Sequence, residues 1–402
     1  MRNFESYGIQ AVTALIAVAL FGGVIIAVVN GWARRTDFSA LYTAGYMVAH
    51  GDGRRLYDLR EQQVVEAELL RRPGFLRIIH PPFEAVLLAP LSWLPYEQAY
   101  AVWGALNTFV WLFWACLVRP HVPVPERNLE YLLLCVSFLP AWVALLEGQT
   151  SLVLLLLFTL TFVSLKQNKQ FRAGAFLALG LFRFQLILPF ALICLLRREW
   201  RMIRGFTVVA LGLGVLSIAA VGPSGVADYS TLLSHMALHA ADPVYAVIVQ
   251  SMPCVRGFFA ITMSTHFSAI WIGATIAAFS AFLILFAAWW WKRQDQRLGL
   301  ASLSQTFSVA VLVCMMTAFH FYIYDLTIAL LPLLLIIGHS HRQSSWSRCN
   351  VIAAILFFPG TYVLLLASDR MYMLFPVLVA FFLAAVLLRS TPLSGSVGGD
   401  RC

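Results

Sequence analysis

Long apolar runs constrain this chain more than any other feature of its sequence. A helix needs ~20 mostly apolar residues to cross a bilayer, and the chain offers about ten such stretches. Only 12% of its 402 residues are charged and 60% are hydrophobic, whereas a soluble domain has about twice that charged share. Membrane β-barrels show alternating rather than continuous apolar residues. We therefore expect an all-α polytopic membrane protein.

Short basic loops between the apolar runs predict the orientation of the chain. Loops rich in Lys and Arg stay in the cytoplasm. We assign four such loops there: 166–172, 197–204, 291–297 and 339–348. The loop 119–128 is a weaker fifth candidate. The net charge of +9 is concentrated in these loops, so nucleic acid is not an expected partner. The seven cysteines are scattered, mostly within apolar runs, and predict neither a disulfide framework nor a metal site.

The basic loops and the apolar runs together define a path through the membrane. We interpret the first run, 9–29, as a retained helix, because no clear cleavage site follows it. The later spans are expected at 98–118, 129–147, 149–165, 203–221, 266–291, 303–321, 323–338, 350–367 and 372–388. Residues 1–388 would form one membrane domain of about 10–12 transmembrane helices, and 389–402 a disordered cytoplasmic tail.

Three segments do not fit a simple crossing. Residues 30–97 form a long external segment, in which 56–72 and 81–95 are expected to be helices at the membrane interface. The segment 173–196 has basic loops at both ends, so it must turn back within the membrane. The expected turn is FRFQ, 182–185, and it would carry Arg183 deep into the protein.

Ionisable side chains in or beside apolar spans are costly and often functional, and the predicted path brings several of them to the outer face. Asp37 suits a general base, although it could instead pair with Arg34 or Arg35 or cap the following helix. Arg183 needs an anion or several carbonyl groups. A phosphate fits its fork of donors well, and Glu147 is an alternative structural partner.

The remaining polar residues of the outer face are also open to two interpretations. His80 lies in HPP, which either forms a simple turn or donates to a phosphate. Glu147 and Gln149 lie in LEGQTS, which either forms a simple turn between two spans or contributes to the site. A third outer turn contains His320, Tyr324 and Asp325, and an external loop contains Gln250 and Arg256. We treat His80, Arg183, His320 and Arg256 as candidates for binding a donor phosphate, and Tyr42, Glu147, Gln149, Gln250, Tyr324 and Asp325 as candidates for binding sugar or acceptor.

Several of these motifs resemble glycosyltransferase family 87, the polyprenol-phosphate-mannose-dependent enzymes. DFSALYTAG, GDGRRLYD and HPPFEAVLLAPLSWLPYEQAYAVW resemble the N-terminal signature of the family. EGQTSLVLLLL, AGAFLALGLFRFQLILPF, VQSMPCVRG and FHFYIYDL resemble its later blocks in the same order. The resemblance runs from about residue 36 to about residue 335. Arg183 stands where the family usually has a lysine, and the asparagine that the family tends to have before Gln-Ser is absent.

The resemblance implies the GT-C architecture and an inverting transfer of a sugar, mannose in this family, from a polyprenyl phosphate. Asp37 matches the position of the catalytic acid and would act as general base on an acceptor hydroxyl. The partners would be the lipid-linked donor, a lipid-linked or glycan acceptor and membrane lipid. No cofactor is implied, and a divalent metal is left open. The enzyme would lie in a bacterial cytoplasmic membrane, serve the cell-envelope glycan and work on the extracytoplasmic side.

Three other functions remain open at the level of sequence. A secondary transporter also has broken helices and buried charges, but no internal repeat is visible. A polymerase or ligase of lipid-linked glycans would be expected to have its large external loop late in the chain, whereas here it comes first. A scaffold subunit with an inactive GT-C core would tolerate Asp37→Asn.

Overall fold

The computed structural model describes residues 32–71, 76–122, 128–238, 247–342 and 347–388, with a few isolated positions before residue 32. Every regular element in these ranges is helical, and no strand occurs in them. The chain is an all-α polytopic membrane protein, as the sequence predicts. The expected first helix lies almost wholly outside the described residues, and the expected tail lies outside them altogether.

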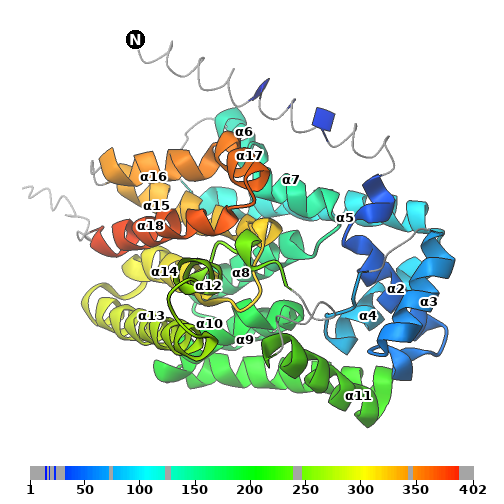
Figure 1. The fold of residues 1–402 in the computed structure, drawn as a ribbon. Coiled ribbons are helices and arrows are strands. Elements are labelled where there is room, and N and C mark those ends of the chain that lie inside the picture. Colours follow the sequence, from blue (N-terminus) through cyan, green and yellow to red (C-terminus); the bar gives the residue numbers. More distant parts are fainter. Residues whose placement is uncertain are drawn as a thin grey trace, which may run out of the picture.

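The helices follow one another with short connections (Figure 1). The first half comprises η1 (Trp32–Arg35), α2 (Phe38–Ala49), η2 (Gly53–Arg55), α3 (Leu59–Leu70), α4 (Pro82–Leu88), η3 (Ala89–Trp93), α5 (Tyr96–Val118), η4 (Arg119–His121), α6 (Asn128–Val136), α7 (Leu139–Leu146), α8 (Ser151–Lys166), α9 (Gln170–Leu179), η5 (Gly180–Arg183) and α10 (Phe184–Leu196). The second half comprises α11 (Trp200–Leu238), η6 (Val249–Ser251), α12 (Val255–Met263), α13 (Ala269–Leu298), η7 (Gly299–Ser302), α14 (Leu303–Thr317), η8 (Ile323–Ala329), α15 (Leu330–Arg342), α16 (Ser347–Phe357), α17 (Pro359–Ala367), η9 (Met371–Leu374) and α18 (Phe375–Leu387).

Candidate membrane spans in the described ranges match the apolar runs of the sequence. Four stretches are long and apolar enough to cross a membrane by themselves, and two bent helix pairs would bring the number to six. The bent pairs are α6–α7, at 55°, and α16–α17, at 61°. Four shorter apolar helical segments of 10–17 residues accompany them. The expected 10–12 spans require these shorter segments to cross as well, so that number stays a prediction.

The segment that was expected to turn back does so. Length and hydropathy alone would make Gln170–Leu196 a single span, but its two ends lie side by side. Gln170 Nε2 donates to Glu199 Oε2 at 3.2 Å, a contact that a straight helix with a rise of ~1.5 Å per residue would prevent. The 3-10 turn η5 therefore separates two short helices, and Arg183 lies at the tip of the hairpin, where the sequence predicts it.

The helices before α5 form a helical cap at one end of the bundle (Figure 1). Helices α2, α3 and α4 lie together there, beside the last part of α11 (Figure 1). Helix α11 reaches this cap because it kinks at Gly222, the residue before Pro223. The φ of Gly222 is 73°, which is outside the helical region. Leu232 and Met236, beyond the kink, share a buried cluster with Met47 and Ile78 of the cap. The cap and the end of α11 thus form one packed unit.

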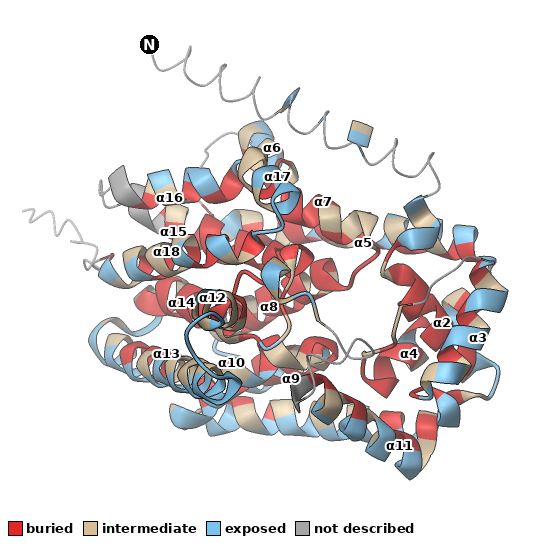
Figure 2. Cartoon of the chain, in the orientation of Figure 1, coloured by how far each residue is buried: buried red, intermediate tan, exposed pale blue. Residues whose placement is uncertain are grey.

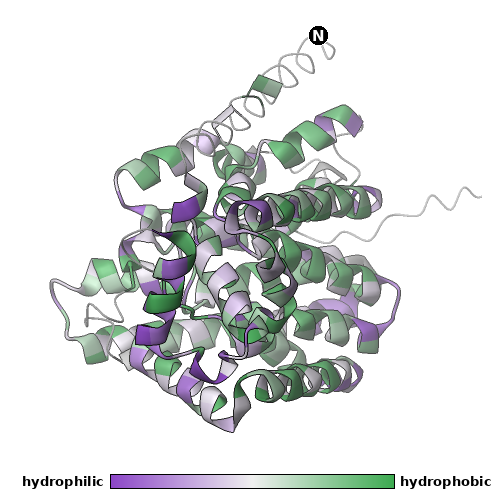
Figure 3. Ribbon diagram, turned by 90° about the vertical axis from the view of Figure 1, so that its right-hand side faces the viewer, coloured by the Kyte–Doolittle hydropathy of each residue, from purple (hydrophilic) through white to green (hydrophobic). Residues whose placement is uncertain are grey.

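Helix α14 is the centre of the bundle and α13 lies at its periphery. Almost every residue of α14 is buried, including its polar Gln305 and Thr306. Figure 2 shows the contrast between α14 and the largely exposed faces of α11 and α13. These exposed faces are apolar, with Trp271 66% and Ile270 82% exposed, as expected of helices that contact lipid. Figure 3 shows hydrophobic residues along the helices and hydrophilic ones gathered at helix ends and on the cap.

The close contact between α9 and α11 provides a test of the hairpin. A Cβ at Gly174 would lie 1.9 Å from the carbonyl oxygen of Met202, so we expect Gly174→Ala to force the two helices apart. The cost should be about 1–3 kcal/mol, as for other over-packed sites. The measurement is thermal unfolding of the purified protein in detergent.

Gly104→Ala is the matched control for this substitution. Gly104 lies in α5 with no atom within 4 Å of the added Cβ, and alanine favours helix over glycine by about 1 kcal/mol. We expect this variant to unfold at the wild-type temperature or slightly above it. Equal behaviour of the two variants would contradict the close packing of α9 on α11.

Candidate active site

The segment that contains Asp37 is fixed on the loop between α7 and α8. The backbone N–H of Phe38 donates to the carbonyl of Glu147 at 3.0 Å, and the backbone N–H of Asp37 donates to Glu147 Oε2 at 3.2 Å. Gly148 makes this approach possible, because its φ is +65° and a Cβ there would lie 2.6 Å from Phe38 Cβ. LEGQTS is therefore a turn between helices, and it also positions Asp37.

The Asp37 carboxylate takes neither of the structural roles that its sequence position allows. Asp37 precedes α2, but its side chain makes no capping hydrogen bond. Arg34 pairs with Glu97. Gln149 Nε2 instead donates to Asp37 Oδ2 at 2.6 Å. Within the described ranges no hydrogen-bond partner occupies the second carboxylate oxygen of Asp37, so that oxygen can accept a proton.

Arg183 is connected to Asp37 through the same glutamine. Its guanidinium is 2% exposed and donates from Nη2 to Gln149 Oε1. Its Nε lies 3.8 Å from Asp325 Oδ1. The structural partner of Arg183 is thus Asp325 and not Glu147. The side-chain amide of Gln149 therefore holds both residues in one arrangement, because its oxygen accepts from Arg183 and its nitrogen donates to Asp37.

Asp325 is itself held by neighbouring groups at the start of η8. Ser151 Oγ donates to Asp325 Oδ1 at 3.2 Å, and the backbone N–H of Tyr322 donates to Asp325 Oδ2 at 3.1 Å. Tyr324 lies beside the pair, with its ring centre 5.5 Å from Arg183 Cζ. Each of these contacts stabilises a buried charge that would otherwise be costly.

A narrow pocket lies against Arg183. Besides Arg183 it is lined by the polar side chains of His80, Gln185 and His320, and by Ile79, Phe182, Phe184, Leu233, Met236 and Phe319. Two of its buried nitrogens, Arg183 Nε and His320 Nδ1, have no hydrogen-bond partner among the residues that the structure describes. Because buried polar atoms are normally paired, this arrangement favours a ligand that accepts hydrogen bonds at this point.

His320 does not add a second fixed positive charge to the pocket. Its pKa is lowered to about 3, first because the ring is buried and then because Arg183 and Arg256 lie nearby. His80 takes part in a different contact, with its Nδ1 2.8 Å from Glu84 Oε2. Arg183 is therefore the main fixed positive charge beside the pocket.

Three further candidates from the sequence, Tyr42, Arg256 and Gln250, lie at different distances from Arg183 and the narrow pocket. Tyr42 packs between Phe38 and Tyr96 and donates its hydroxyl to the carbonyl of Leu94 at 2.8 Å. Arg256 donates to the carbonyl of Phe319 at 2.9 Å and covers its ring, so it contacts the rim of the pocket. Gln250 is exposed on η6. Their expected binding roles stay predictions.

The sequence interpretation missed three residues of the site. Gln185 lines the pocket and donates to the carbonyl of His320 at 3.2 Å; as a polar residue in an apolar run it carried the same signal as Arg183. Ser151 and Phe319 gave no comparable signal. No group of three or more His, Cys, Asp or Glu in the described ranges is placed to hold a metal ion.

Comparison with known proteins places much of the site inside one family profile. The profile of glycosyltransferase family 87 matches residues 79–317, more than half of the chain. The match includes His80, Gln149 and Arg183, and leaves out Asp37 and Asp325. No curated protein and no solved structure matches the chain.

Glu147 provides a pH-dependent test of the way the Asp37 segment is held. Its pKa is raised from 4.5 to about 7, first by burial and then by the charge of Asp37. The folded protein therefore binds more protons than the unfolded chain between these values, and stability falls as pH rises through this window. We expect Glu147→Gln to remove this slope, so that above pH 7 the variant unfolds at a higher temperature than the wild type.

The measurement is thermal unfolding in detergent from pH 4.5 to pH 8 for both proteins. Glu68→Gln, on the exposed face of α3, is the matched control and should follow the wild type. Parallel profiles for Glu147→Gln and wild type would contradict the burial of this carboxylate beside Asp37.

Proposed function

Because this chain belongs to glycosyltransferase family 87, we propose that it moves a sugar, mannose in the first instance, from a polyprenyl phosphate to an acceptor hydroxyl. The family establishes a membrane glycosyltransferase. The donor, the inverting course and the role of Asp37 are our proposals. The observation that carries them is the link Asp37–Gln149–Arg183, beside a pocket with unpartnered buried nitrogens.

The lining of the narrow pocket supports a lipid phosphate as donor. Its apolar residues, such as Phe184 and Met236, suit the first part of a prenyl chain, and Arg183, Gln185 and His320 suit a phosphate. A nucleotide would require more polar surface for its base and ribose. The donor would then enter from the membrane.

The charges near the pocket favour one phosphate over two. Arg183 is a single cation, and its charge is already shared with Asp325. His320 is neutral. A sugar phosphodiester carries one negative charge, whereas a diphosphate carries at least two, which a single guanidinium would not balance in a buried site. We therefore favour a monophosphate-linked donor.

In the proposed step, the acceptor oxygen attacks the anomeric carbon from the side opposite the phosphate. The new C–O bond forms as the bond to the phosphate oxygen breaks, and the electron pair leaves with the phosphate. Asp37 takes the proton from the acceptor hydroxyl, and Gln149 holds the carboxylate in position. Arg183 and the neutral His320 stabilise the negative charge that grows on the phosphate. One displacement of this kind inverts the anomeric centre.

We further propose that the site opens on the extracytoplasmic side of a bacterial cytoplasmic membrane. The cap that carries Asp37 and the tip of the hairpin that carries Arg183 lie together. The basic residues Lys169, Arg197 and Arg201 lie at the ends of that hairpin and at the start of α11. The positive-inside rule would place those ends in the cytoplasm and the site on the other face. The product would then belong to the cell envelope.

Asp37→Asn tests this proposal directly. Loss of a general base costs typically 10²–10⁴-fold in rate, so we expect transfer to fall by at least ~100-fold. The measurement is transfer from polyprenyl-phosphate-mannose to a crude glycolipid fraction by purified protein in detergent. Asp52→Asn is the matched control, because Asp52 lies in the same cap and its side chain makes no capping hydrogen bond. Equal rates for Asp37→Asn and wild type would remove Asp37 as the base.

A further inference from the structure

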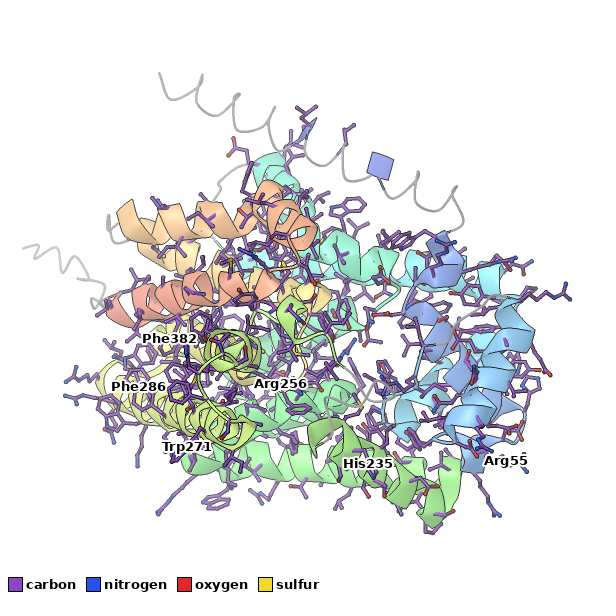
Figure 4. All side chains as sticks on the ribbon, in the orientation of Figure 1. Arg55, His235, Arg256, Trp271, Phe286 and Phe382 are labelled. Carbon is purple, nitrogen blue, oxygen red and sulfur yellow. The ribbon has the colours of Figure 1, made fainter. Side chains whose placement is uncertain are left out.

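A second pocket lies on the other side of the segment that carries His80. It is wider than the narrow pocket and is lined by Arg54, Arg55, Tyr57, Asp58, Leu59, Asp228, Thr231, Leu232 and His235. Its walls are the η2–α3 junction and the part of α11 beyond the kink. Figure 4 shows Arg55 and His235 on these two walls. Neither the family match nor the proposed donor chemistry accounts for this pocket.

The two pockets share a wall. The hydroxyl of Tyr57, which lines the second pocket, donates to the carbonyl of His80, which lines the narrow one, at 2.7 Å. Tyr229 lies against Tyr57, with ring centres 4.9 Å apart. On α11, Leu232 and His235 line the second pocket, and Leu233 and Met236 line the narrow one. A molecule in the second pocket would therefore lie one layer of side chains from the proposed donor.

The linings of the two pockets differ in chemistry. The narrow pocket is mainly apolar, whereas the second contains two guanidinium groups, two carboxylates, an imidazole and two hydroxyls. Its lining has two arginines, Arg54 and Arg55, and two aspartates, Asp58 and Asp228, so their formal charges cancel. The second pocket has a larger share of polar surface than the narrow one, and a highly charged ligand would find no net opposite charge there. Polar groups of both signs suit a neutral molecule with many hydroxyls.

We propose that this second pocket binds the saccharide portion of a neutral glycan acceptor. This inference rests on the proposed function, since it assigns the acceptor to the same transfer. Asp228 and the Oδ2 of Asp58 accept hydrogen bonds from sugar hydroxyls, while Asp58 Oδ1 caps α3. Arg54 and Arg55 donate to sugar oxygens. Tyr57 connects the occupied pocket to the segment that carries His80. Donor and acceptor saccharide would thus occupy separate pockets of different polarity.

A charge-neutral double substitution tests this assignment. Arg55→Ala with Asp228→Ala removes one cation and one anion from the pocket, and both residues are exposed, so the fold should persist. The control is Arg60→Ala with Glu68→Ala, which removes the same charges from exposed positions of α3 outside the pocket. Monodisperse elution and an unchanged unfolding temperature would verify that both variants are folded.

The first measurement is binding of α-mannobiose, a neutral disaccharide, to full-length protein in detergent, by saturation-transfer NMR. We expect at least tenfold weaker binding for the pocket variant and wild-type binding for the control. Wild-type affinity in the pocket variant would overturn the proposal, and so would a wild-type protein that binds no neutral disaccharide.

The second measurement is the transfer rate as a function of acceptor and of donor concentration. We expect the acceptor concentration for half-maximal rate to rise about tenfold in the pocket variant, with the donor value unchanged. A change in the donor value alone would overturn the assignment. If the wild type transferred no sugar yet bound the disaccharide in this pocket, the proposed function would fail while the saccharide pocket stood.

Discussion

A guanidinium that is buried in an apolar helical protein must be met by oxygen atoms, and here that requirement connects distant parts of the chain. Arg183 contacts Gln149 and Asp325, and Gln149 also holds Asp37. Removing one member of a buried ion pair typically costs about 3–5 kcal/mol. The cap, the loop after α7, the hairpin tip and η8 are therefore bound to one another at the same point that offers an acid and a cation for chemistry.

This arrangement depends on the two interruptions of helical geometry around it. The hairpin α9–α10 carries Arg183 into the protein, and its ends are held together by the contact of Gln170 with Glu199. The kink of α11 at Gly222 turns its last part toward the cap. Without the first, Arg183 would not reach Gln149 and Asp325. Without the second, neither pocket would have the wall that α11 supplies.

The sequence predicted the features that hydropathy and charge determine. Apolar runs located the helices, and basic loops on both sides of 173–196 required the turn at Arg183, because one helix cannot begin and end on the same side. Contacts between distant segments were harder to predict. The pairing of Arg183 with Asp325 and the bridging role of Gln149 depend on side-chain directions that no periodicity reveals. The lowered pKa of His320 depends on burial beside two arginines. Helix α12 begins in the segment around Arg256 that the sequence predicts to be an external loop.

The central claim is that a donor phosphate lies against Arg183, and a structure of the protein with bound polyprenyl phosphate tests it most directly. The account predicts phosphate density in the narrow pocket, with phosphate oxygens within hydrogen-bond distance of Arg183 Nε and the His320 ring, and the prenyl chain leading toward lipid. Phosphate density at the opposite end of the hairpin, beside Arg197, with no ligand at Arg183, would contradict it.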